Sequence, residues 1–142
     1  FDNDCFILRG QTKNNTKKIG DLGEKVAQQY LIEHGFLVLE VNYWRKWGEI
    51  DIIAEDKEGL VHFVEVKTVS YETKGELEDA ITSGAWRPEE QVTDRKLHQI
   101  HKALETWLSA NNYNGDWGID VIGVRMVPSV RYCTVNMITN VT

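Results

Sequence analysis

The chain has 142 residues, of which 42% are hydrophobic and 27% are charged, and its formal net charge is −6. This length and composition suit one folded domain with its own core, and they argue against disorder. No apolar run approaches the roughly 20 residues that span a bilayer. The acidic balance counts against a general nucleic-acid binder, because such proteins gain most of their affinity from cations on phosphates.

The sequence also limits the expected compartment. The two cysteines, Cys5 and Cys133, are too few and too far apart for a disulfide framework or a zinc site. No basic stretch followed by an apolar one forms a signal segment. We therefore expect a cytoplasmic protein. Because the sequence begins at Phe1 rather than Met, an organellar location is also open if a targeting segment lies upstream.

Residues 1–18 are predicted to be a flexible lead-in, and residues 19–142 a single domain. From about Gly20 to His34 the apolar residues recur at helical spacing. Glu24 borders the apolar face of this helix. One interpretation places Glu24 in the first turn, where the helix dipole favours an acid, and the other gives it a functional role. A β-type run at residues 36–43 follows the helix.

The centre of the sequence holds two short apolar runs that carry charged residues, Trp47–Ala54 and Leu60–Thr68. The polar stretch Glu55–Gly59 between them fits a hairpin connection. Side chains alternate faces along a strand, so the two acids of the first run, Glu49 and Asp51, are predicted to share one face. The opposite face is then predicted to hold Ile50, Ile52 and Ala54.

Paired antiparallel, these two strands are predicted to bring Asp51, Glu65 and Lys67 into one site. Two neighbouring carboxylates repel each other unless a cation lies between them, and oxygen ligands favour Mg²⁺ or Mn²⁺. The lysine would orient or deprotonate an attacking water, or neutralise a phosphate. The alternative is a surface hairpin whose polar face carries solvated charges in weak ion pairs.

The second half of the chain is predicted to hold one helix and two strands. The stretch Glu72–Pro88 lacks a clear period, so we expect a long functional or mobile loop in which Trp86 and Arg87 would contact a ligand. Thr93 is predicted to cap a helix that runs to about Ala110. Strands are expected near residues 118–124 and 130–138, so the predicted order is α-β-β-β-α-β-β.

The motif GEID followed by FVEVK resembles the PD-(D/E)XK nuclease superfamily, and in particular its YraN-like branch, which is related to Holliday-junction resolvases. Further matching motifs are Gly20–Ala27, Asn42, Lys96 and Asp120–Ile122, so the similarity spans residues 20–125. The resemblance implies a restriction-endonuclease-like core, which is an α/β fold with a central mixed sheet flanked by helices. It also implies a divalent-metal-dependent DNA endonuclease, with branched DNA as one substrate class and a homodimer as one assembly.

The same resemblance assigns roles to individual residues. Asp51 and Glu65 would bind Mg²⁺ or Mn²⁺ together with the Val66 carbonyl, Glu24 would hold the metal or its waters, and Lys67 would activate the water. The basic residues expected to contact nucleic acid are Arg45, Lys46, Arg87 and Lys96. The tryptophans on either side of Arg45 and Lys46 would stack on an exposed base or else pack inside the protein.

Two positions depart from the pattern of the YraN-like branch. Val69 and Gly118 stand where that branch usually has arginines, so two phosphate contacts are missing. Together with the acidic net charge, this favours a second hypothesis, a non-catalytic module that keeps the nuclease fold and binds nucleic acid or protein. Hydrolysis of another phosphodiester, such as RNA, is a third.

Overall fold

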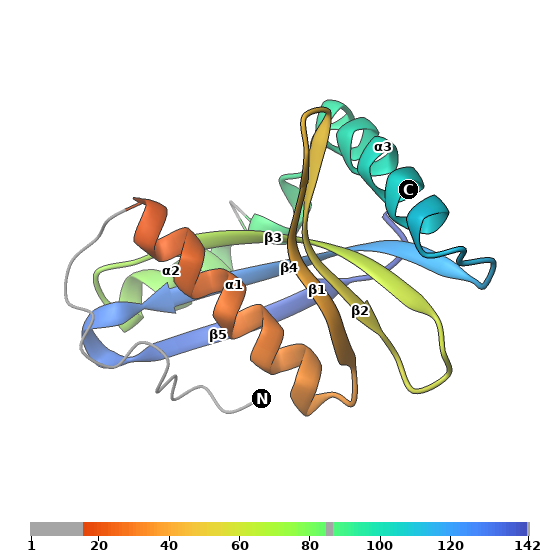
Figure 1. Ribbon diagram of the computed structural model, residues 1–142. Coiled ribbons are helices and arrows are strands. Elements are labelled where there is room, and N and C mark those ends of the chain that lie inside the picture. The colour runs from red at the N-terminus through yellow and green to blue at the C-terminus, as the bar shows by residue number, and fades with distance from the viewer. Residues whose placement is uncertain (1–15, 85–86, 142) are drawn as a thin grey trace.

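A computed structural model describes residues 16–84 and 87–141, and its five strands form one sheet (Figure 1). The strands are β1 (Leu37–Arg45), β2 (Gly48–Glu55), β3 (Val61–Ser70), β4 (Trp117–Val127) and β5 (Tyr132–Ile138). They are ordered β1-β2-β3-β4-β5, and all neighbours are antiparallel except β3 and β4, which are parallel. The predicted α/β class with a central mixed sheet is therefore confirmed.

Helices pack against both faces of this sheet (Figure 1). They are α1 (Thr16–Glu33), α2 (Lys74–Ser83) and α3 (Asp94–Ala110), and the 3-10 turns η2 (Pro88–Glu90) and η3 (Pro128–Val130) complete the described elements. The connection from β3 to β4 contains α2, η2 and α3, as a parallel pair requires a long crossover. None of the described helices is long and apolar enough to cross a membrane.

The sheet separates two hydrophobic clusters, one beneath α1 and one beneath α3. Because side chains alternate along a strand, β3 gives Val64 to the α1 cluster and Phe63 to the α3 cluster, and both side chains are fully buried. Cys133 of β5 is buried in the α1 cluster and is not a free thiol, whereas Cys5 lies outside the described residues. Glu65 and Lys67 of β3 are on the same face of the strand as Phe63, which is the α3 side.

Strand β2 leaves β3 part-way along its length. The two strands pair only from Ile52 opposite Val64 to Glu55 opposite Val61, whereas β2 stays paired with β1 to the hairpin tip. Past this point the β1–β2 hairpin bends away toward α3 (Figure 1). Ile50 consequently packs in the α3 cluster, while Ile52 lies in the α1 cluster. We predicted that Ile50, Ile52 and Ala54 share one face. The prediction is wrong for Ile50, because the strand twists where it leaves β3.

The stretch Glu72–Pro88, predicted to be a loop, instead forms α2 and the start of η2. The Thr73 hydroxyl caps α2 by accepting a hydrogen bond from the Glu76 amide at 3.1 Å. Leu77 is the buried residue of this helix, so the sequence carries no repeating apolar stripe that would reveal it. Trp86, predicted as a ligand contact, lies outside the described residues.

Helix α1 begins at Thr16, earlier than the predicted start at Gly20, so residues 16–18 of the expected lead-in are helical. Its first turn contains no acidic residue. Glu24 therefore lies well inside the helix, and the helix dipole does not explain its presence. Helix α3, in contrast, starts as predicted, because the Thr93 hydroxyl accepts a hydrogen bond from the Lys96 amide at 3.1 Å.

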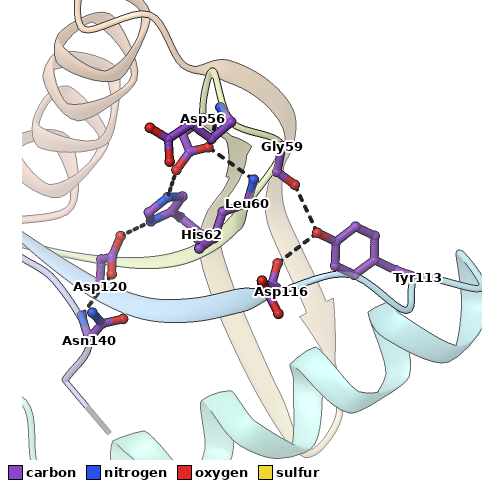
Figure 2. Close-up of polar contacts among 9 residues, drawn as sticks. Asp56, Gly59, Leu60, His62, Tyr113, Asp116, Asp120 and Asn140 are labelled. Atoms are coloured by element: carbon purple, nitrogen blue, oxygen red, sulfur yellow. Dashed lines mark hydrogen bonds and ion pairs between the residues drawn. The ribbon is translucent and has the colours of Figure 1, made fainter.

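Near the β2–β3 turn, a histidine hydrogen-bonds two carboxylates and connects β3 to β4 and to the turn (Figure 2). The His62 ring of β3 hydrogen-bonds Asp120 of β4 through Nδ1 and Asp56 of the β2–β3 turn through Nε2, the latter at 2.9 Å. Asp120 is fully buried, and its Oδ1 also accepts a hydrogen bond from the backbone amide of Asn140 at 3.1 Å. Burial lowers the pKa of His62, but the hydrogen bonds to Asp120 and Asp56 outweigh it, so the pKa is raised overall.

We predict that this network makes stability depend on pH. A His62→Gln variant should lose about 2 kcal/mol, the value of hydrogen bonds to charged groups. Because the pKa of His62 is raised in the folded state, the deficit should be full below the unfolded value of 6.5 and should shrink as the pH rises through the folded pKa. Thermal unfolding of both proteins across this range is the measurement. A deficit that grows with pH would contradict the charged network.

Candidate active site where two strands separate

Because β2 separates from β3, the backbone of β3 from Glu65 onward has no β2 partner on this edge. The Asp51 side chain bonds to the first backbone amide left unpaired by β2. Its carboxylate accepts a hydrogen bond from the Val66 amide at 2.8 Å, in place of a carbonyl of β2. The amide and carbonyl of one strand residue point to the same side of the strand. The Val66 carbonyl therefore faces the same opening as the Asp51 carboxylate.

A pocket of about 480 Å³ lies along this open edge. One wall comes from the N-terminal half of α1 and the other from β3; the lining residues are Ile19, Gly20, Glu24, Asp51, Val66, Lys67, Thr68, Val69 and Ser70. Helix α1 comes very close to β3 here, because a Cβ at Gly23 would overlap the Thr68 side chain. The neighbouring Glu24 is thereby held at the pocket beside Asp51 and Lys67.

Glu65 lies behind this pocket, on the α3 side of the sheet, and is only 4% exposed. Burial raises its pKa well above the usual range, and the hydrogen bond and negative charge of Asp51 raise it further, while Lys96 and Lys67 lower it. The Lys96 ammonium of α3 lies 3.4 Å from Oε2 of Glu65. This ion pair explains a lysine in the first turn of α3, where the helix dipole disfavours it.

Glu24 is the second carboxyl group of the site whose pKa is raised. Burial, then the negative charges of Asp51, Glu49 and Asp21, raise the pKa of Glu24 to about 7. Acids from α1, β2 and β3 thus gather around one opening. Such a gathering favours the binding of a proton or a cation.

The donors at this opening fit a magnesium-type ion. No three described His, Cys, Asp or Glu side chains form a ready-made metal cluster. Mg²⁺, however, keeps several waters and usually takes only one or two carboxylates from the protein. Asp51 and Glu65 supply two adjacent carboxylates, and the Val66 carbonyl supplies a third oxygen facing the same side. Glu24 lines the opposite wall of the same pocket, on α1.

The four predicted nucleic-acid contacts occupy different places. Lys96 lies in the site, against Glu65. Arg45 and Lys46 lie at the tip of the β1–β2 hairpin, where their charges stand 4.1 Å from the Tyr43 ring centre and 5.9 Å from the Trp47 ring centre. Arg87 is exposed beside η2 and lies 3.8 Å from Glu90. Those last three are not among the residues that line the pocket.

Glu89 of η2 is a further acid near the site that the sequence analysis did not single out. It is 6% exposed, packs directly over Gly123 of β4, and its Oε2 has no hydrogen-bond partner among the described residues. Gly123 is the β4 neighbour of Lys67, so Glu89 lies on the sheet face that carries Lys67. The adjacent charges of Glu89 and Glu90 resemble an ordinary solvated pair, and only the fold reveals that one of them is buried.

We predict that Glu24 destabilises the metal-free protein at high pH. Its folded pKa of about 7 exceeds the ordinary 4.5, so the folded state binds more protons between these values and stability falls as the pH rises through them. A Glu24→Gln variant should unfold at a higher temperature than wild type above pH 7. Below pH 4.5, where the carboxyl is protonated in both states, the two proteins should unfold alike.

The measurement is thermal unfolding of both proteins in EDTA. Glu78→Gln, on the exposed side of α2, is the matched control, because it removes one negative charge from a residue that does not line the pocket. An equal gain from Glu78→Gln would mean that net charge, rather than repulsion at the site, explains the effect. A lower unfolding temperature for Glu24→Gln above pH 7 would also contradict the prediction.

Comparison with known proteins identifies the family of this chain. The model described as "Uncharacterised protein family UPF0102" matches residues 23–124. Similar relatives include UPF0102 proteins of Trichlorobacter lovleyi (41% identity, 66% of this chain and 65% of the relative) and Mycolicibacterium smegmatis (38% identity, 82% and 87%). The chain thus spans just under two thirds of the Trichlorobacter protein. The structure of Pyrococcus furiosus SfsA in complex with Ca²⁺ is also similar, at 14% identity, with 86% of this chain and 63% of that chain covered and a TM-score of 0.33.

Proposed function

We propose that this chain, which belongs to the UPF0102 family of YraN-like, PD-(D/E)XK nuclease-fold proteins, is a divalent-metal-dependent endonuclease that hydrolyses DNA. One observation carries the proposal. Where β2 separates from β3, Glu24, Asp51, Val66 and Lys67 line one pocket, and the buried Glu65 behind it contacts Asp51. A solvated surface hairpin would not bury Glu65 beside a second carboxylate, because that arrangement costs stability unless a cation binds.

Each residue has a role that follows from its position. Asp51 and Glu65 would hold Mg²⁺ or Mn²⁺ with the Val66 carbonyl, and the bound ion would supply Lewis-acid stabilisation of the charge that develops on the phosphate. Lys67 lines the pocket and can orient the attacking water or take its proton. Glu24, with its pKa near 7, can accept a hydrogen bond or a proton from that water at neutral pH.

Lys96 helps Glu65 tolerate burial while no metal is bound. Its ammonium is close enough to neutralise the carboxylate in part, and its side chain is about one quarter exposed. With a divalent ion held by Asp51 and Glu65, the Lys96 ammonium would be available to a phosphate oxygen of the substrate. The same contact supports the second hypothesis, in which Lys96 replaces the metal permanently and the fold binds nucleic acid or protein without cutting it.

We predict metal-dependent cleavage that the site residues control. The wild-type protein should cut labelled DNA with Mg²⁺ or Mn²⁺ and not with EDTA. Asp51→Asn and Lys67→Ala should each lower the cleavage rate by at least about 100-fold, the usual contribution of an acid–base or charge-stabilising group. Four-way junction, flap, single-stranded and linear duplex substrates should be compared in one assay.

Two matched variants serve as controls. Glu78→Gln and Lys57→Ala remove an exposed acid and an exposed lysine outside the pocket lining, and both should cut at the wild-type rate. A folded protein that cuts none of these substrates with either metal, yet binds one of them, would establish the non-catalytic module instead. Cleavage that survives in Asp51→Asn and Lys67→Ala would locate the activity elsewhere.

A further inference from the structure

The tip of the β1–β2 hairpin exposes two tryptophans beside two basic residues. Trp44 is 64% exposed and Trp47 is 40% exposed. Among the described residues Trp44 is the most exposed large hydrophobic side chain. A single exposed apolar side chain is common, but two exposed indoles at one hairpin tip form a candidate binding surface.

The tip is held in place rather than free to move. Arg45 pairs with Gly48, so Lys46 and Trp47 form a two-residue turn. The Arg45 guanidinium donates a hydrogen bond to the Trp44 carbonyl at 2.7 Å and lies over the buried Tyr43 ring. A Cβ at Gly48 would overlap the Gln99 carbonyl oxygen, so the turn rests directly on α3. A surface fixed in this way binds a ligand with little cost for ordering side chains.

The exposed indole faces the side of the hairpin that carries the acidic site. Trp44 is the cross-strand neighbour of Glu49, and such neighbours project from the same face of a strand pair. Glu49 is close enough to Glu24 for its charge to act on that carboxyl. In addition, the turn contacts α3 at Gln99, which is one helical turn after Lys96, the residue that contacts Glu65.

Positive charge accompanies the aromatic rings at the tip. The Lys46 ammonium lies 5.9 Å from the Trp47 ring centre. Trp47 also borders a shallow cavity of about 480 Å³ with Lys102, Glu105 and Thr106 of α3. An aromatic platform beside lysines is the combination that binds a base by its face and the adjacent phosphate by its charge. In a chain with a net charge of −6, this tip offers phosphate a local attraction that the protein as a whole does not.

We propose that the hairpin tip binds single-stranded nucleic acid, with an unpaired base stacked on Trp44 and the adjoining phosphate contacted by Lys46. A base in intact duplex is stacked on its neighbours and cannot offer its face without being extruded. The inference rests on the proposed nuclease function and narrows it. The bond that the site cuts lies next to an unpaired stretch, so substrates with single-stranded regions are preferred over continuous duplex.

Binding measured without metal separates this inference from cleavage. Fluorescence anisotropy in EDTA would follow a labelled oligothymidine and a duplex of equal length. Trp44→Ala should weaken binding of the single strand roughly 5- to 150-fold, the range for loss of one base–aromatic stack. Trp44→Phe, which keeps a ring, should restore most of it, and the duplex affinity should change little in either variant.

A second variant tests the phosphate contact. Lys46→Gln should weaken single-strand binding and reduce the dependence of log affinity on log salt by about 0.7, the value for one phosphate contact on a single strand. Tyr132→Ala is the matched control, because Tyr132 carries a comparable pair, with the Lys74 ammonium 4.4 Å from its ring centre, on β5. It should leave both affinities at the wild-type values.

The possible results lead to different conclusions. If Trp44→Ala loses single-strand affinity but wild-type protein never cuts DNA, the hairpin inference stands and the nuclease proposal fails. If the protein cuts DNA while Trp44→Ala binds single strands as tightly as wild type, the inference is overturned and the nuclease proposal stands. A third result would be a lower molecular mass in solution for Trp44→Ala than for wild type, with DNA affinity unchanged. That result would show that the tip contacts a second copy of the chain, and it would also overturn the inference.

Discussion

The candidate site depends on the early separation of β2 from β3. If the two strands stayed paired along their full length, the Val66 amide and carbonyl would bond to β2 and no pocket would open beside them. The Asp51 carboxylate takes over the amide instead, at 2.8 Å, and the carbonyl stays available. The same separation directs the hairpin toward α3, where Gly48 rests against the helix. One break in a β-ladder thus creates both the acidic pocket and the exposed tip.

Two pairs of acidic residues lie on β3 and the elements next to it, Asp56 with Asp120 and Asp51 with Glu65. The two pairs differ in how their negative charge is compensated. At one end, the His62 ring hydrogen-bonds both Asp56 and Asp120, which raises the pKa of His62 and connects β3 to β4 and to the β2–β3 turn. At the other, Asp51 and Glu65 contact each other and receive only partial compensation from Lys96. An incompletely neutralised acid pair lowers stability and favours a bound cation, which is the usual compromise at functional sites.

Much of this arrangement could be predicted from the sequence. The two apolar runs with charged residues located β2 and β3, the hydrophobic period and the Thr93 cap located α3, and the motif resemblance identified the family. Sequence could not show α2, whose single buried residue gives no period, or the twist that moves Ile50 to the other cluster. Glu89 was missed for a related reason: its burial over Gly123 arises from chain segments that are distant along the sequence.

We propose that Asp51, Glu65 and the Val66 carbonyl hold one divalent ion where β2 leaves β3. A crystal structure of the protein soaked in Mn²⁺ tests it most directly, because the anomalous signal of manganese locates the ion without reference to activity. We expect one strong peak within about 2.0–2.4 Å of both carboxylates and of the carbonyl oxygen, the range for such hard cations. The peak should be absent in Asp51→Asn crystals. A peak at another place, or an Mn²⁺-soaked crystal in which Lys96 still pairs with Glu65 and no ion is present, would contradict it.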